Sequence, residues 1–189
     1  MRLQIHALTE NLAILSGAQS GRNLFSKLIA AAAPQGGEPA PVFLDFAGVT
    51  VATASFLRES VVAFRDYTRS TLPALFPVVA NASASVTEEL DFFLRHRKDA
   101  IWSCRLDKHG ALNEPRLLGE LDEAHRMTFE MVIKLGSASA PTLAAQSTEG
   151  AAVSPTAWNN RLAFLAARGL LMERRGGKTK TFSPVLEAT

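Results

Sequence analysis

Few side chains in this sequence have the types and spacing that catalysis or metal binding requires. The four histidines are His6, His96, His109 and His125, and no two of them stand at a spacing typical of metal ligands. The single cysteine, Cys104, lies among apolar residues in a segment typical of a strand, so we interpret it as a core residue rather than a nucleophile. Because it is the only cysteine, the chain has no internal disulfide bond.

Two other patterns point toward enzymes but lack the context that enzymes need. Gly176-Gly177-Lys178-Thr179 is similar to the end of a phosphate-binding loop, but Met172 stands where that loop needs its first glycine. Asp45 ends a predicted strand, where a carboxylate can hold a cation or act as a base, but neither a second carboxylate nor a glycine-rich loop stands beside it. We therefore expect no enzyme, with no catalytic residue, no metal site and no cofactor.

The positive charge of the sequence is local. The net charge is only +2, and residues 1–120 contain 12 acids and 12 bases. Between Ser154 and Lys180, however, a single anion, Glu173, accompanies six cations: Arg161, Arg168, Arg174, Arg175, Lys178 and Lys180. Such a cluster is typical of a surface that binds phosphates, and the alternative is a solvated positive face.

Residues 120–189 carry start and stop signals for a fixed order of elements. The expected elements are a helix over 121–135, a short helix after Ser139, a helix over 155–168, and a hairpin of 170–173 with 179–182. Gly136 and Gly169 are typical helix ends, and Ser154-Pro155 is a typical helix start. This order predicts a winged helix-turn-helix domain, in which the second helix of the turn enters the major groove of DNA.

The helix expected over 155–168 has an apolar face and a face of small and polar residues. A helical wheel turns Trp158, Leu162 and Leu165 toward the core. The opposite face consists of Thr156, Asn160, Ala163 and Ala167, with Asn159 at its edge. An asparagine amide can pair with an adenine edge, and alanines let the helix approach the groove closely. The alternative is that the asparagines are simply solvated.

We therefore predict two kinds of DNA contact. Polar residues of the helix would contact base edges, and the hairpin cations would contact phosphates, which position the domain without selecting a sequence. Arg161 lies on the flank of the helix. We weigh two roles for it equally, a contact with phosphate and a structural ion pair. The predicted DNA-binding set is Thr156, Asn159, Asn160, Arg161, Arg174, Arg175, Lys178 and Lys180.

Residues 1–119 alternate strand-like and helix-like segments. Strands are expected over 3–8, 12–15, 42–46 and 75–80, and a hairpin over 101–106 and 116–118. Helices are expected from Gly21, from Ser55 as N-cap, and after a capping box of Ser85 and Glu88. This alternation favours an α/β fold with helices packed on a small, partly parallel sheet. The chain would then consist of an α/β domain over 1–119 and an α+β domain over 120–189.

Two segments resemble known families. Asp45-Phe46-Ala47-Gly48-Val49, followed by Ala52-Thr53-Ala54-Ser55-Phe56-Leu57, resembles the STAS-like domains, relatives of the anti-sigma-factor antagonists. Ala157-Trp158-Asn159-Asn160-Arg161-Leu162 with Gly169-Leu170-Leu171 is similar to winged helix-turn-helix regulators. The first resemblance implies a phosphorylated serine where Ala54 stands, which has no hydroxyl. Thr53 or Ser55 could replace it as phosphoacceptor, and the alternative is that Ser55 is only an N-cap.

The resemblances and the basic cluster imply a bacterial DNA-binding transcriptional regulator. Its partners would be double-stranded DNA and, through the first half, a second copy of the chain or a signalling protein such as a kinase or ATPase. We expect a homodimer that pairs through the hairpin Ile101–Leu118. We also expect residues Leu121–Thr189 to fold alone, because their apolar stripes can close on themselves without residues from the first half. The alternative function is a protein-interaction module of a partner-switching circuit without direct DNA binding.

The sequence shows no segment typical of export or of a membrane span. Its start, Met1–His6, lacks the apolar run of a signal peptide. The longest strongly apolar stretch, Leu28–Ala33, is far shorter than the roughly 20 residues that cross a bilayer. We therefore expect a cytoplasmic protein with no membrane partner.

Overall fold

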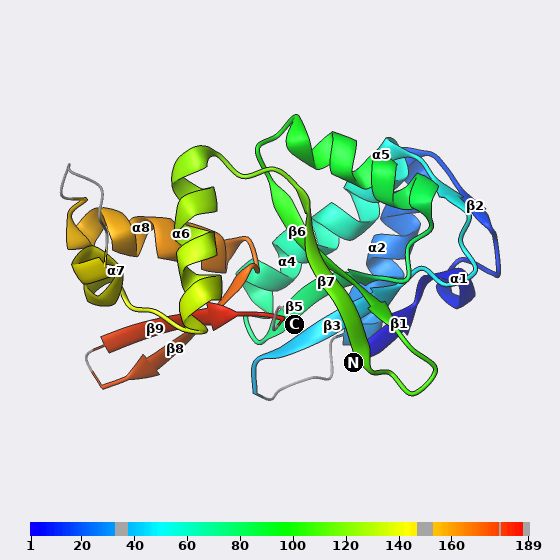
Figure 1. Ribbon diagram of the computed structural model, residues 1–189. Helices are drawn as coiled ribbons and strands as arrows, with labels where there is room; N and C mark the ends of the chain where they lie inside the picture. Colours follow the sequence, from blue (N-terminus) through cyan, green and yellow to red (C-terminus); the bar gives the residue numbers. More distant parts are fainter. Residues whose placement is uncertain (33–37, 147–152, 178, 187–189) are drawn as a thin grey trace.

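A five-stranded sheet forms the centre of the N-terminal half (Figure 1). The computed structural model describes residues 1–32, 38–146, 153–177 and 179–186. In spatial order the strands are β1 (Arg2–Gln4), β3 (Ala40–Asp45), β5 (Leu75–Ala80), β6 (Ala100–Leu106) and β7 (Leu112–Gly119). The first four are parallel, and β7 runs antiparallel to β6. The expected α/β class, with a partly parallel sheet, is confirmed.

Helices cover one face of this sheet. They are α2 (Ala18–Ala32), α3 (Ala54–Leu57), the π-helical segment η1 (Arg58–Val62), α4 (Ala63–Thr71) and α5 (Ala84–Arg95). Their apolar side chains share a core with Val42, Leu44 and Val79 of the sheet, because alternate residues of a strand point to the same face. A short helix, α1 (Ile5–Leu8), and a parallel pair of β2 (Ile14–Leu15) and β4 (Val51–Ala52) complete this half. The strand expected over 3–8 therefore ends early and turns into α1.

The C-terminal part contains the expected helices and hairpin in the expected order. The elements are α6 (Glu123–Leu135), α7 (Ala140–Gln146), α8 (Pro155–Ala167), β8 (Leu171–Gly176) and β9 (Thr179–Pro184). An isolated bridge joins Ala138 to Phe182, so the chain between α6 and α7 pairs with β9. The hydroxyl of Ser154 accepts a hydrogen bond from the backbone N–H of Ala157 at 3.2 Å and caps α8, as predicted.

Gly169 marks the point where α8 ends and the hairpin begins. Its φ angle is +74°, which favours glycine, and an added Cβ would lie 3.2 Å from Cδ of Arg69 in α4. The backbone conformation therefore calls for a glycine here, and any side chain would in addition have to displace the side chain of Arg69.

Two helix caps differ from the prediction. Thr53, not Ser55, caps α3, and its hydroxyl accepts a hydrogen bond from Phe56 N at 3.4 Å. Ser83, not Ser85, caps α5, where its hydroxyl accepts from Val86 N at 3.2 Å. Ser83 also donates to the carbonyl of Thr50 at 2.7 Å. The local sequence allows either Ser83 or Ser85 to be the N-cap. The contact with Thr50, from another part of the fold, favours Ser83.

The second core joins the C-terminal part to the sheet. Phe76 and Val78 of β5 and Trp102 of β6 point to the face opposite the helices and pack in one cluster with Trp158 and Leu162 of α8. The expectation that the apolar stripes of 121–189 close on themselves is therefore wrong. Both faces of β5 are covered, which is why all six of its residues are buried.

Candidate nucleic-acid interface

Helix α8 is fixed by its apolar face. Trp158, Leu162 and Leu165 are each 0% exposed. On the opposite face Thr156 and Asn160 are exposed. Ala167 on that face is also exposed, whereas Ala163 and the edge residue Asn159 are half-buried. The helix therefore presents to solvent the polar and small side chains that the wheel placed there.

Arg161 lies against the core side of α8 rather than in solvent. Its guanidinium carbon is 5.1 Å from the ring centroid of Trp158, within the range of a cation–π contact. Its Nη1 is buried and has no hydrogen-bond partner among the described residues. Arg161 forms no ion pair among those residues, and the contact of its guanidinium with the ring of Trp158 favours a structural role.

The hairpin β8–β9 carries three described cations around one acid. Arg175 and Lys180 are directly opposite each other in the strand register, an arrangement in which like charges repel. Oε1 of Glu173 lies 3.0 Å from Nε of Arg175 and 3.1 Å from Nζ of Lys180 and relieves this repulsion. Arg174 is exposed. The described part of the hairpin thus has a net charge of +2, and Lys178 lies outside the described residues.

The same contacts govern the titration of Glu173. Partial burial acts to raise its pKa, but the hydrogen bonds from Arg175 and Lys180 and their positive charges outweigh burial. The pKa of Glu173 is therefore below its ordinary value. The carboxylate is therefore ionised at neutral pH, where it bridges Arg175 and Lys180.

Arg168 is partly exposed, and its guanidinium pairs with a buried carboxylate, that of Asp99. Its Nη1 donates to Oδ2 of Asp99 at 3.0 Å, and Asp99 also accepts two hydrogen bonds from Arg65, at 3.1 and 2.8 Å. Arg65 and Asp99 are 1% and 2% exposed. Burial acts to lower the pKa of Arg65, but Asp99 and Asp66 raise it above its ordinary value. No sequence signal pointed to this network, because its members are distant in the chain.

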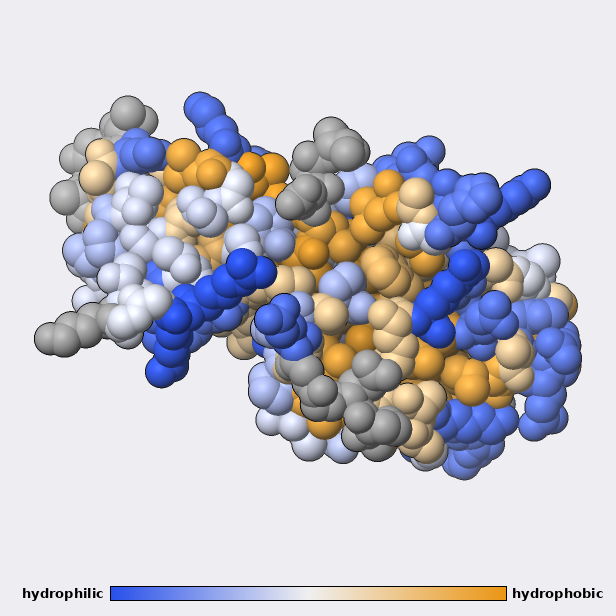
Figure 2. Space-filling model, turned by 90° about the horizontal axis from the view of Figure 1, so that it is seen from below, coloured by the Kyte–Doolittle hydropathy of each residue, from blue (hydrophilic) through white to orange (hydrophobic). Residues whose placement is uncertain are grey.

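The start of α8 and the hairpin β8–β9 belong to a lobe that extends away from the five-stranded sheet. Figure 1 shows α7, the start of α8 and the strands β8 and β9 together in that lobe. Figure 2 shows hydrophilic side chains projecting from this lobe, with apolar surface between it and the rest of the molecule. A large, flat or grooved partner could therefore reach this lobe without meeting the sheet.

The two candidate phosphoacceptors are half-buried. The hydroxyl of Thr53 accepts hydrogen bonds from Phe56 N and from Gly17 N, at 3.4 and 3.3 Å, and is 3.2 Å from that of Ser55. Glu89 accepts a hydrogen bond from Ala54 N at 2.9 Å and places a negative charge beside this turn. Thr53 is thus the cap that the sequence analysis assigned to Ser55.

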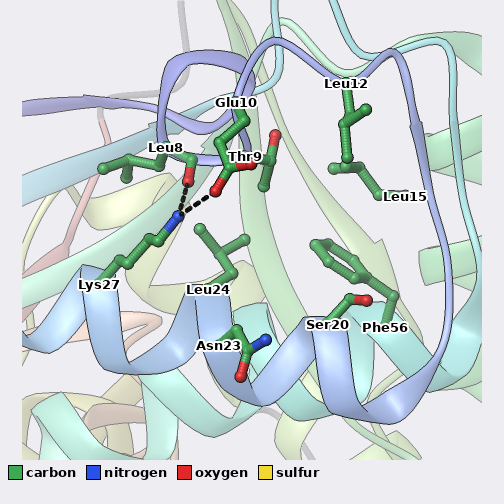
Figure 3. Close-up of a pocket in the computed structure, with 10 residues that line it drawn as sticks. All are labelled: Leu8, Thr9, Glu10, Leu12, Leu15, Ser20, Asn23, Leu24, Lys27 and Phe56. Atoms are coloured by element: carbon green, nitrogen blue, oxygen red, sulfur yellow. Dashed lines mark hydrogen bonds and ion pairs between the residues drawn. The ribbon is translucent and has the colours of Figure 1, made fainter.

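A small cavity of about 140 Å³ lies between α1 and α2 (Figure 3). Its floor is apolar, formed by Leu15, Leu24 and Phe56. At its rim Nζ of Lys27 donates to the carbonyl of Leu8 at 2.8 Å and lies 3.5 Å from the carboxylate of Glu10. The cavity is below the roughly 300 Å³ of ordinary ligand pockets, and the two charged groups at its rim contact each other.

Asp45 and Cys104, whose side chains have the chemistry that catalysis uses, both have structural surroundings. The carboxylate of Asp45 is 2% exposed. It accepts hydrogen bonds from Arg2 Nε at 2.8 Å, from Ala47 N at 3.1 Å and from Asn81 Nδ2 at 2.9 Å. Burial raises the pKa of Cys104 to about 11, with a smaller effect from Asp45, so its thiol is protonated at neutral pH.

The remaining searches give no further candidate. In the described part of the chain no three His, Cys, Asp or Glu side chains lie close enough to share a metal ion. Within those same ranges, no helix is both long and apolar enough to pass through a lipid bilayer. Comparison of the chain with protein-family models, curated proteins and solved structures finds no match. The two family resemblances stay predictions.

Proposed function

We propose that this chain is a DNA-binding transcriptional regulator with two units, a STAS-like α/β domain over 1–119 and a winged helix-turn-helix domain over 120–189. The observation that carries the proposal is that α8 exposes Thr156 and Asn160 to solvent and that the start of this helix and the cationic hairpin β8–β9 belong to one lobe, which extends away from the sheet (Figure 1). In this proposal α8 enters the major groove and the hairpin contacts the flanking phosphates.

Base contacts come from the polar residues of α8. Asn160 and Thr156 are exposed on the face opposite the buried Trp158, and an asparagine amide can bond an adenine edge with two hydrogen bonds. Ala163 and Ala167 are small enough for the helix to lie close to the bases. Each good contact of this kind discriminates between bases by about 1–3 kcal/mol.

Phosphate contacts come from the hairpin. Arg174 is exposed and forms no ion pair among the described residues, so it is the most available of these cations. Arg175 and Lys180 share Glu173 and can exchange it for phosphates. Contacts of this kind raise the affinity for every sequence and make binding depend on salt.

The test compares variants of the two kinds in the full chain. Asn160→Ala should weaken binding to the preferred duplex by about 1–3 kcal/mol and leave random DNA unaffected. Arg174→Ala should weaken binding to both and lower the salt slope by about one. Lys108→Ala removes an exposed cation from the β6–β7 turn and should change neither. A well-folded chain that binds no duplex DNA at low salt, or identical effects of Asn160→Ala and Arg174→Ala, would refute the assignment.

The proposal includes a homodimer, because one chain carries one reading helix and a twofold pair doubles the contacts with DNA. The predicted contact through the β6–β7 hairpin is unfavourable. Pro115 stands within the edge strand β7 and has no N–H, and Glu114 beside it has a φ angle of +51°. We place the contact instead at the β2–β4 patch, formed by Leu12, Ile14 and Val51, which are large apolar side chains exposed to solvent.

One observation favours the alternative, a partner-switching module without DNA binding. Strand β4 leads directly into Thr53, so the β2–β4 patch adjoins the two candidate phosphoacceptors. A kinase or ATPase partner would then cover the patch. A purified chain that is monomeric and binds no DNA would support this alternative over the regulator.

A further inference from the structure

A small notch lies between the β6–β7 hairpin and the start of α5. Ser103 of β6 is paired with Arg116 of β7 in the strand register. Both point to the face of the sheet that packs against α5, because Ile101 and Leu118, two residues away along each strand, belong to the core on that face. Thr87, in the first turn of α5, lines the notch from the helix.

The notch has room for one small polar atom. Its volume is about 10 Å³, which is roughly the space that a single water molecule needs. A ligand can therefore place one oxygen atom in the notch, while the rest of the ligand stays outside.

Two hydroxyl groups of the notch are without a partner. Ser103 is only 4% exposed, and its hydroxyl makes no hydrogen bond among the described residues. The hydroxyl of the half-buried Thr87 makes none there either. Because a buried hydroxyl without a hydrogen bond is unfavourable, these two donors favour an oxygen atom in the notch.

Two arginines flank these hydroxyls. Arg105 and Arg116 line the notch, both are exposed, and neither forms an ion pair in the part of the chain that the structure describes. The one acid of the lining is Glu114, so the two arginines leave a net charge of +1. The notch also lies at the start of α5, where the helix dipole attracts negative charge. The surroundings of the hydroxyls therefore favour an anion over water.

The arrangement of donors fits a tetrahedral oxyanion better than a carboxylate. The two oxygens of a carboxylate lie in one plane, whereas those of a phosphate point in several directions. One phosphate oxygen can accept from the hydroxyls while others accept from the arginines, and arginine pairs with phosphate through strong charge-assisted hydrogen bonds. A phosphate monoester also carries between one and two negative charges at neutral pH.

We propose that the notch between the β6–β7 hairpin and α5 binds a phosphate group, either inorganic phosphate or the phosphate of a small monoester. One oxygen lies in the notch against Ser103 and Thr87, and the others lie against Arg105 and Arg116. The site belongs to the α/β half of the chain and is independent of the proposed binding of DNA.

The test is an NMR titration of the full chain with inorganic phosphate at constant ionic strength. The backbone amide resonances of Ser103 and Thr87 should shift saturably, with a dissociation constant on the order of 1 mM for so small a ligand. Acetate should bind about ten-fold more weakly. Methyl phosphate distinguishes the two sources: binding within about three-fold of phosphate indicates a monoester site, and much weaker binding indicates a site for free phosphate.

Variants locate the site. Ser103→Ala removes one hydroxyl and should weaken phosphate binding by about ten-fold, as expected for a hydrogen bond to a charged group. Arg105→Ala and Arg116→Ala should each weaken it by about two- to five-fold, as expected for exposed charge pairs. Lys108→Ala removes an exposed cation from the turn of the same hairpin and should leave binding unchanged. Circular dichroism checks the fold of each variant.

Three results would overturn the proposal. The first is the absence of saturable shifts at Ser103 and Thr87, which indicates that the notch holds only water. The second is equal binding of acetate and phosphate. The third is unchanged phosphate binding by both Ser103→Ala and the Arg105→Ala/Arg116→Ala double variant. The titration contains no DNA, and the DNA assays change residues of α8 and the β8–β9 hairpin, so failure of one proposal is distinguishable from failure of the other.

Discussion

Glu173 gives the sharpest test of the proposed interface, because removing its charge should have opposite effects on the hairpin and on DNA binding. Its carboxylate bridges Arg175 and Lys180, which are cross-strand neighbours of like charge. Glu173→Gln keeps the size and shape of the side chain and removes the charge. The hairpin should become less stable, while the affinity for DNA should rise.

The expected magnitudes follow from the geometry. Each of the two ion pairs is partly exposed and is worth about 0.2–1 kcal/mol, so the substitution should lower the free energy of unfolding by about 1 kcal/mol. A carboxylate about 6 Å from a phosphate costs about 0.7 kcal/mol in water, which corresponds to about three-fold in affinity. Arg175 and Lys180 are also freed for phosphates, so the affinity should rise by about three- to ten-fold and the salt slope by about one.

Fluorescence anisotropy with labelled duplexes between about 50 and 200 mM salt measures both quantities. Glu120→Gln is the matched control, since Glu120 forms an ion pair with Lys98 at 2.6 Å and lies outside the hairpin. It removes the same unit of charge and should change DNA affinity by less than about two-fold. If Glu173→Gln fails to tighten binding, or if Glu120→Gln tightens it equally, the hairpin does not lie on phosphates.

The pH dependence of stability provides an independent check on Glu173. Its pKa in the folded chain is below the ordinary value of 4.5, so its stabilising effect is fully present above that value and is lost as the pH falls through the folded pKa. The difference in thermal stability between the natural chain and Glu173→Gln should therefore be constant near neutral pH and should close on acidification. A difference that persists below the folded pKa would show that the effect is not one of charge.

Three further predictions concern other parts of the fold. Asp99→Asn leaves the buried guanidinium of Arg65 without its carboxylate partner and should lower the free energy of unfolding in urea by about 3–5 kcal/mol. Arg168→Ala removes a partly exposed partner of Asp99 and should lower it by about 1 kcal/mol. Equal losses from the two variants would contradict this interpretation of the network. Cys104, with a pKa of about 11, should be alkylated at pH 8 at least about 100-fold more slowly in the native chain than in the unfolded chain, and comparable rates would contradict its burial. Light scattering should show a dimer of the full chain that Ile14→Glu converts to a monomer, and an unchanged dimer would exclude the β2–β4 patch.

The elements that sequence analysis located best are those with local signals. Ser154 and Pro155 begin α8, Gly169 follows its end, and each acts through contacts within a few residues. The core face of α8 followed from helical periodicity alone, and Trp158 and Leu162 are fully buried as expected. Such features depend on short-range geometry, which the order of residues determines directly.

The features that sequence analysis missed depend on contacts between distant residues. Arg168 counted as one of six clustered cations, but its guanidinium binds Asp99, which is 69 positions away in the chain. Arg161 was weighed between phosphate and an acid, but its guanidinium carbon lies 5.1 Å from the ring centroid of Trp158. Charge counting cannot separate these cases, since it records the sign of a side chain and not its surroundings.

The shared core has a consequence for how the two halves act together. Two contacts connect the region of β6 to the end of α8. The indole N–H of Trp102 in β6 donates to the carbonyl of Leu170 at 2.9 Å, and Arg168 donates to Asp99, the residue before β6, at 3.0 Å. They bracket Gly169, where α8 gives way to the hairpin. A shift of β6 would therefore move both proposed DNA-binding elements at their junction. The orientation of α8 and the hairpin thus depends on the sheet, and a fragment over 121–189 would lose that support and expose the apolar residues that Phe76 and Trp102 now cover.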